Sequence, residues 1–377
     1  MMMPAASSSP SPTATATATT SSSSSSYPPL AVATRLHLGN ASHPPPRSRL
    51  LETLGSFYRL ASEIGATLAI VAVDGASKFE GYDLVAEVEE ICLSLTAIVD
   101  PAPAAAGGGA AAAGGGGDDG GAAIAVPTTA MRVLPVTPWG RFVPALNAIV
   151  ARCADEGMGC VLVASAEVWI DRAAADALRS ELFDGDGEDG AETLVVGAVL
   201  RGHDYRAGGR GGGAVEVGLT GRTAPWNTCA LWDVPKLALT GFHLVSEGLH
   251  PDDESNSGDG GGDGGWCAGI EEVATIAVLQ RVLSPRRARA KLVALPGMVS
   301  WATEDFGDDA NRREWHERKM ESKCARAKRQ LDLLGLSDGV VIHCCYFVRR
   351  RRGGSEKRAS RRVSRDSTDT HDARSFE

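Results

Sequence analysis

Acidic and hydroxyl side chains stand at three places where an apolar run ends or a helix is predicted to begin. Asp74 closes the apolar run 69–73, and Ser165 and Glu167 follow the apolar run 160–164. Glu271 and Glu272 open a predicted helix. Carboxylates in such positions can accept hydrogen bonds from a nucleotide, bind a divalent cation or act as a general base.

Each position also has a purely structural interpretation. An Asp-Gly pair such as Asp74-Gly75 is a common turn. Glu271 and Glu272 would be stabilised in the first turn of a helix by the helix dipole. His316 lies in a highly charged run, so it could ligate a metal or lie on the solvated side of a long helix. The residue types alone therefore leave both interpretations open.

The apolar pattern predicts strands that alternate with helices. Strands are predicted at 30–38, 67–73, 131–136, 160–164 and 193–200, and helices at 50–65, 82–96, 142–156 and 171–182. This alternation predicts an α/β fold, a Rossmann-like three-layer α/β/α arrangement with a mostly parallel central sheet. Ligands of such sheets bind at the carboxyl ends of the strands, where the polar side chains above are found.

Composition narrows the class of protein. The chain has 377 residues and a formal charge of −9. Ten Lys/Arg and five Asp/Glu from Arg349 to Glu377 give that end +5 and leave −14 for the rest. An acidic body argues against a nucleic-acid partner, whose phosphates need a basic surface. No apolar run of about 18 residues is present, so no membrane span is predicted.

Cysteine usage favours a reducing compartment. None of the eight cysteines forms a Cys-x-x-Cys pair, and several lie in apolar runs, where a thiol acts as a small hydrophobic group. We therefore predict an intracellular protein, with the cytoplasm favoured and the Golgi, a plastid or the nucleus left open.

Low-complexity segments divide the chain. Residues 1–29 carry no charge and predict a disordered leader, and 346–377 predict a disordered basic tail. A single domain is expected between them, at 30–345. Its Gly-, Ala- and Asp-rich insertions are predicted near 101–123, 184–192, 206–213 and 251–265.

A dehydrogenase or methyltransferase would need a Gly-rich loop after the first strand, and 38–46 contains none.

The series of motifs over about 30–283 resembles family 2 glycosyltransferases of the GT-A fold. Val-Asp-Gly-Ala-Ser at 73–77 is similar to that family's Val-Asp-Asp-Gly-Ser, and 139–147 ends in its Ala-Leu-Asn. Ser-Ala-Glu at 165–167 stands where the family has Asp-Ala-Asp. Gly-Phe at 241–242 and Glu-Glu at 271–272 stand where it has Gly-Gly-Phe and Glu-Asp. Each motif is degenerate, and their order carries the resemblance.

The resemblance implies an inverting transferase that uses a nucleotide-diphospho-sugar donor and an acceptor that the sequence does not identify. It implies nucleotide binding by these residues: Asp74, Ser77, Asn147 and Ser165. It implies a divalent cation, Mn²⁺ or Mg²⁺, held by Glu167, with His316 a further candidate ligand from its residue type. Glu272, next to Glu271, would be the base that deprotonates the acceptor.

The departures from the family define the alternative. Ser165 replaces the first Asp of the metal motif, which removes one negative charge, and Glu272 replaces an Asp. The Gln-x-x-Arg-Trp motif of processive members is absent, so a polymer-extruding synthase is not expected. The second hypothesis is therefore a catalytically degenerate GT-A-like binding protein whose basic tail is an interaction arm.

Overall fold

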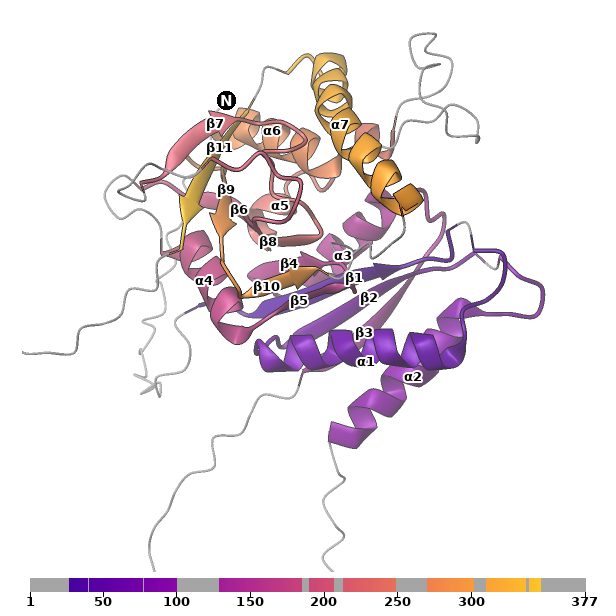
Figure 1. Cartoon of the computed structure of the whole chain (residues 1–377). Coiled ribbons are helices and arrows are strands. Elements are labelled where there is room, and N and C mark those ends of the chain that lie inside the picture. The colour runs from indigo at the N-terminus through magenta and orange to yellow at the C-terminus, as the bar shows by residue number, and fades with distance from the viewer. Residues whose placement is uncertain are drawn as a thin grey trace, which may run out of the picture. The chain divides into compact units, whose positions relative to one another are not determined.

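A nine-stranded sheet forms the centre of the computed structural model (Figure 1). The structure describes residues 27–39, 41–76, 78–99, 129–184, 190–206, 213–248, 270–301, 310–336 and 339–346. The chain up to Tyr346 clusters into one compact unit. The predicted insertions have their centres outside the described residues, as do the leader before Tyr27 and the tail after Tyr346.

Most neighbouring strands of the sheet are parallel. Their order is β3 (Ala130–Val136), β2 (Leu68–Asp74), β1 (Leu30–Leu36), β4 (Cys160–Ala164), β8 (Cys229–Asp233), β6 (Thr193–Ala198), β9 (Arg289–Ala294), β11 (Val340–Cys345) and β7 (Val215–Gly218). Only β8, against β4 and β6, and β7, against β11, run antiparallel to their neighbours. A separate two-stranded sheet pairs β5 (Val168–Ile170) with β10 (Val299–Trp301).

Helices cover both faces of the sheet. The elements are α1 (Arg47–Glu63), α2 (Leu84–Val99), α3 (Val143–Asp155), α4 (Arg172–Phe183), α5 (Val234–Leu237), the 3-10 helix η1 (Leu244–Glu247), α6 (Glu271–Leu283) and α7 (Ala310–Leu333). One core cluster packs α1, α2 and α4 on one face, and the other packs α3, α5 and α6 on the opposite face. This is the predicted three-layer α/β/α arrangement.

The apolar patterns explain why these elements form. Ile70 of β2 faces one core cluster and Val71 the other, so a strand buried on both faces appears as an unbroken apolar run. Helix α4 begins where Asp171 accepts a hydrogen bond from the amide of Ala174 at 2.7 Å. The sequence predicted both elements.

The observed elements differ from the predictions at a few places. The short strands β5, β7 and β10 were not predicted, and neither was β8 with its antiparallel direction. The described domain also begins three residues before the predicted boundary. The carbonyl of Pro28 accepts from Arg179 at 2.8 Å, and that of Pro29 accepts from the amide of Gly159 at 3.0 Å. Backbone groups without side-chain periodicity form these contacts, so a pattern search does not find them.

Gly197 of β6 packs closely against Pro225 in the loop that precedes β8, and we predict that this contact requires glycine. A Cβ at this position would lie 2.6 Å from Pro225 Cβ and 2.8 Å from Pro225 Cα. We expect Gly197→Ala to lower the free energy of unfolding by about 1–3 kcal/mol, the usual cost of overpacking. Urea unfolding measures this. Gly218→Ala in β7 is the matched control, since its Cβ would meet no atom within 4 Å. Equal stability of the two variants would contradict the packing argument.

Candidate functional site

A cavity of about 750 Å³ opens at the carboxyl ends of β1 and β4. These strands pair in parallel, with Ala33 opposite Val163, and beyond this pair their chains separate. The connection after β1 forms α1 on one face, whereas β4 is reached through α3 on the other face. The cavity therefore lies where the connections change sides, the place where open α/β sheets bind ligands.

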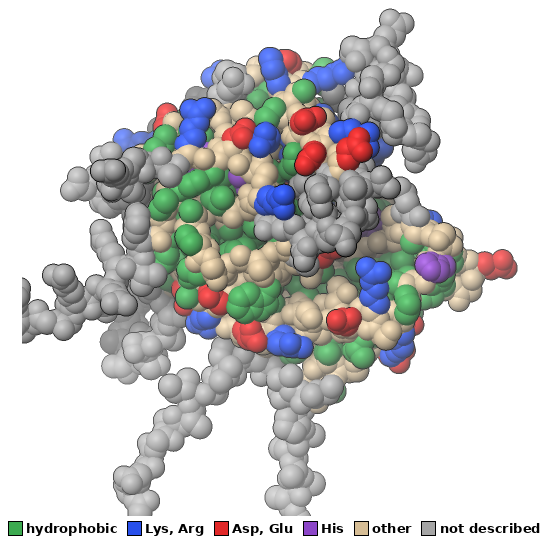
Figure 2. All heavy atoms as spheres, viewed as in Figure 1, with side chains coloured by type: hydrophobic (Ala, Val, Ile, Leu, Met, Phe, Trp, Pro, Cys, Tyr) green, Lys and Arg blue, Asp and Glu red, His purple; other side chains and the backbone are tan. Residues whose placement is uncertain are grey.

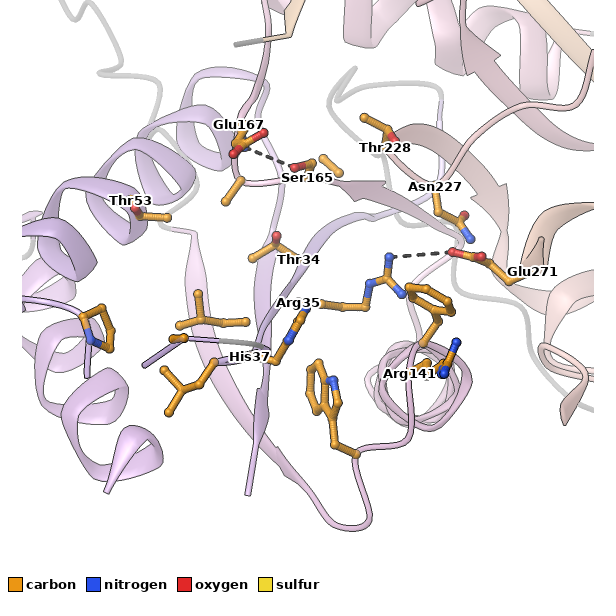
Figure 3. Close-up of a pocket in the computed structure, with 18 of the residues that line it drawn as sticks. Thr34, Arg35, His37, Thr53, Arg141, Ser165, Glu167, Asn227, Thr228 and Glu271 are labelled. Carbon is orange, nitrogen blue, oxygen red and sulfur yellow. Dashed lines mark hydrogen bonds and ion pairs between the residues drawn. The ribbon is translucent and has the colours of Figure 1, made fainter. Parts of the chain in front are cut away.

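Two acidic side chains enter this cavity from the first turn of α6. Glu272 is buried, and its Oε1 accepts a hydrogen bond from the amide of Asn227 at 2.6 Å. Burial and the neighbouring Glu271 raise the pKa of Glu272 to about 7. Arg35, at the end of β1, places its Nη2 atom 3.7 Å from Glu271 Oε1 (Figure 3). The two carboxylates are thus in different environments, one paired with a cation and one near its titration point.

A short backbone segment joins the β4 side of the cavity to the α6 side. The amide of Ser165 donates to the carbonyl of Thr228 at 3.0 Å, and the preceding residue, Asn227, donates to Glu272. Ser165 and Glu167 therefore line the same cavity as the glutamate pair, from a segment about a hundred residues away in the sequence. The structure brings together four of the residues that the sequence singled out.

Several buried side-chain polar atoms in the cavity wall have no hydrogen-bond partner among the described residues. These include Thr34 Oγ1, Arg35 Nη1, Trp139 Nε1 and Asn227 Nδ2. Thr34 and Asn227 are only 2% and 3% exposed. Asn227 is oriented by Trp232, whose Nε1 donates to Asn227 Oδ1 at 2.9 Å and so leaves the amide nitrogen unpaired. Buried donors without partners are costly, and here they meet at one cavity, so the wall suits an acceptor-rich ligand.

Among the described residues that line the cavity, basic side chains outnumber acidic ones. Its basic residues are Arg35, Arg49, Arg141, Lys323 and Arg326, and its acidic residues are Glu167, Glu271 and Glu272. By contrast, acidic and basic side chains are mixed over the outer surface of α1 and α7 (Figure 2). A net positive cavity in an acidic chain favours an anionic ligand.

Two aromatic rings form one side of the cavity. His37 lies beside Trp139, with 5.7 Å between ring centroids, and burial together with the nearby Arg35 lowers the pKa of His37. The loop that carries Trp139 is held by Glu247, whose carboxylate accepts hydrogen bonds from the amides at 141–143. Because Glu247 already occupies the N-terminus of α3, an anionic ligand would have to be bound elsewhere in the cavity.

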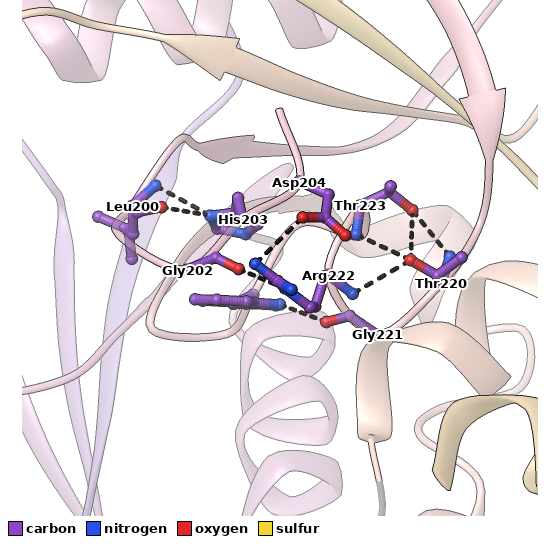
Figure 4. A network of polar contacts seen from close by, with 9 residues as sticks. Leu200, Gly202, His203, Asp204, Thr220, Gly221, Arg222 and Thr223 are labelled. Atoms are coloured by element: carbon purple, nitrogen blue, oxygen red, sulfur yellow. Dashed lines mark hydrogen bonds and ion pairs between the residues drawn. The ribbon is translucent and has the colours of Figure 1, made fainter. Parts of the chain in front are cut away.

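Trp226 is a buried residue of the cavity wall. Its ring stacks on His203 with 3.6 Å between centroids, and Lys323 Nζ lies 3.5 Å from the centroid of the same ring. His203 bonds to the amide of Leu200 and the carbonyl of Ala224, and burial lowers its pKa to about 3. The contacts in Figure 4 tie the turn 200–204 to the turn 220–223. A neutral His203 can therefore stack beneath Trp226 without repelling Lys323.

Two other predicted site residues that the structure describes, Asp74 and Asn147, do not line the cavity. Asp74 ends β2, where its Oδ1 accepts from the amide of Ala76 at 3.0 Å, the turn interaction that the sequence left open. Both ends of the Asn147 amide bond the backbone of Phe242, at 3.0 and 2.7 Å. Ser77 and the side chain of His316 lie outside the described residues. Nucleotide contacts by Asp74, Asn147 and Ser77 stay predictions.

The residues present do not form a recognisable divalent-cation site. Ser165 Oγ accepts from the amide of Glu167 at 3.3 Å, and the Glu167 side chain is exposed. Within the described ranges, no group of three or more His, Cys, Asp or Glu side chains is placed to hold a metal ion. A Mg²⁺ ion that binds together with a nucleotide can use as few as one or two protein carboxylates, because phosphate oxygens complete its coordination. The Mn²⁺ or Mg²⁺ site stays a prediction.

Several cavity residues were not predicted from the sequence: Thr34, Arg35, Trp139 and Asn227. One signal was available, since Arg35 is a charged residue inside an apolar strand segment, at the strand's carboxyl end. No spacing rule could have joined Lys323 to this end of the sheet, because α7 follows all but one of the strands in the chain. Only the tertiary fold brings α7 to the cavity.

No described helix is long and apolar enough to cross a membrane. No protein-family model matches the chain, and no curated protein is found to match it.

Proposed function

We propose that this protein transfers a sugar from a nucleoside-diphosphate donor to an acceptor hydroxyl. The observation that carries the proposal is that one cavity holds buried donors without partners among the described residues, several basic side chains and a buried glutamate pair. The cavity lies at the carboxyl ends of the strands, where α/β sheets bind nucleotides. Its volume of about 750 Å³ lies in the range of small-molecule sites.

The donor's chemistry matches one side of the cavity. A diphosphate is anionic and rich in acceptor oxygens, and Arg35 and Asn227 offer buried N–H groups without partners among the described residues. The aromatic pair His37 and Trp139 offers a flat apolar wall. Charge-assisted hydrogen bonds from a guanidinium to phosphate are among the strongest in proteins.

The acceptor's chemistry matches Glu272. In the proposed step the acceptor hydroxyl gives its proton to Glu272 while its oxygen bonds to the anomeric carbon. The bond from that carbon to the diphosphate oxygen breaks, and the nucleoside diphosphate leaves with the electron pair. A base with a pKa of about 7 is well matched to this task, because it is ionised near neutral pH yet basic enough to hold a proton.

Calorimetric titration with UDP and GDP tests the donor site, with Thr34→Val as the informative variant. Thr34 Oγ1 is buried without a partner among the described residues, so a methyl group there should leave the melting temperature unchanged or raised. If the ligand pairs with this hydroxyl, affinity should fall roughly 2- to 10-fold, as expected for one hydrogen bond. Failure of the wild-type protein to bind either nucleotide would overturn the proposed function.

A binding protein without turnover is the second candidate, favoured by Ser165 in place of an acidic residue. Release of nucleotide from UDP-sugar or GDP-sugar donors separates the two. Binding with no release of nucleotide diphosphate from any donor or acceptor would favour the binding protein.

A further inference from the structure

We infer that the diphosphate is neutralised by side-chain cations, chiefly Arg35 and Lys323, so that nucleotide binding needs no divalent cation. The inference rests on the proposed function, since it concerns the same ligand in the same cavity. It differs from what the resemblance to family 2 glycosyltransferases implies, which is a metal held by the segment 165–167.

The segment 165–167 offers a metal ion one carboxylate, whereas the Asp-Ala-Asp motif of the family offers two. Ser165 carries no charge, and its oxygen already accepts a hydrogen bond from the amide of Glu167. Glu167 is exposed, and it is the sole carboxylate in the segment 165–167. A Mg²⁺ ion that binds together with a nucleotide usually takes one or two protein carboxylates besides phosphate oxygens, so this segment supplies only the smaller number.

Arg35 is in the position that a neutralising cation requires. It extends from the carboxyl end of β1, and its Nη1 atom is buried and without a partner among the described residues. The other nitrogen, Nη2, lies 3.7 Å from Glu271, and the guanidinium carbon lies 5.4 Å from the centroid of the Phe142 ring. Glu271 and Phe142 thus hold the guanidinium while one of its N–H edges stays available to phosphate.

Lys323 of α7 lines the same cavity. Its ammonium lies 3.5 Å from the centroid of the Trp226 ring, and its positive charge offsets part of the rise that burial and Glu271 cause in the pKa of Glu272. Arg326, one helical turn further along α7, also lines the cavity. Two elements that are far apart in sequence therefore each bring positive charge to one small volume.

The test is calorimetric titration of the full chain with UDP and GDP, once with excess EDTA and once with excess Mg²⁺ or Mn²⁺. We expect affinities that agree within about twofold in the two conditions. Arg35→Met is expected to weaken binding in EDTA roughly 10- to 100-fold, the effect of losing a charge-assisted hydrogen bond. Arg35→Lys should recover part of the loss. Arg59→Met, at an exposed site on α1, is the control and should bind as the wild type does.

Two further variants keep the inference falsifiable if Arg35→Met unfolds, which thermal melting would reveal. Lys323→Met should also weaken binding in EDTA, and Glu167→Ala should not weaken it, since the loss of a negative charge favours an anion. Binding that requires Mg²⁺ or Mn²⁺ and is abolished by Glu167→Ala would overturn this inference and leave the proposed function standing. No binding in either condition would overturn both.

Discussion

Replacing Glu272 with glutamine is expected to lower kcat for sugar transfer by about 10²- to 10⁴-fold, the range for removing a general base. Glutamine is nearly the same size and can still accept the hydrogen bond that Asn227 donates at 2.6 Å, so the fold should be retained. Nucleotide affinity should be unchanged or slightly tighter, because the substitution removes a negative charge. Initial rates of nucleotide release and calorimetry with UDP or GDP measure the two effects separately.

The neighbouring carboxylate is the matched control. Glu271 pairs with Arg35, so Glu271→Gln should alter nucleotide affinity more than kcat. If Glu271→Gln lost as much turnover as Glu272→Gln, Glu272 could not be assigned as the base.

The pH dependence of the wild type follows from the raised pKa of Glu272. Turnover should rise with pH through about 7, because only the ionised carboxylate can take the acceptor's proton. Stability should show the opposite trend. Between about pH 4.5 and 7 the unfolded state has lost this proton and the folded state has kept it, so unfolding releases a proton and stability falls as pH rises. Glu272→Gln should remove this contribution, which thermal melts over that pH range would show.

Truncation of Trp226 is expected to produce the largest loss of stability. The side chain is 2% exposed, and its Nε1 donates to the carbonyl of Gly221 at 2.8 Å. We expect Trp226→Ala to lower the free energy of unfolding by about 3–5 kcal/mol, as for other buried aromatic residues. The ring also supports Lys323, so nucleotide affinity should fall in whatever fraction remains folded. Urea unfolding and calorimetry measure these effects.

Trp169 provides a control of the same residue type. It lies on β5 and is 47% exposed, so Trp169→Ala removes little buried surface. Its effect on stability should be small and nucleotide affinity should not change. Comparable losses in the two variants would show that Trp226 has no special role behind the cavity.

The local patterns of the sequence determined the layered α/β fold. Continuous apolar runs such as 68–73 predict strands buried on both faces, and the helical spacing of apolar residues in α1 and α3 predicts the layers that cover them. The same patterns located Glu167 and Glu272 at a strand end and a helix start, because strand ends and helix starts are themselves local features. The antiparallel β8 was not predictable in this way, since strand direction depends on partners distant in sequence.

The composition of the cavity was decided by tertiary structure alone. The α6 glutamates, the β1 arginine and the α7 lysine meet because the connections around the sheet change sides beside β1. Burial raises the pKa of Glu272, and a partner from another segment separates the roles of the two glutamates. A sequence pattern predicts neither the burial of Glu272 nor the pairing of Glu271 with Arg35. Both depend on residues that are far apart in the sequence and come into contact only when the chain folds. The sequence determined which polar groups stand at element ends, and the fold decided which of them share one site.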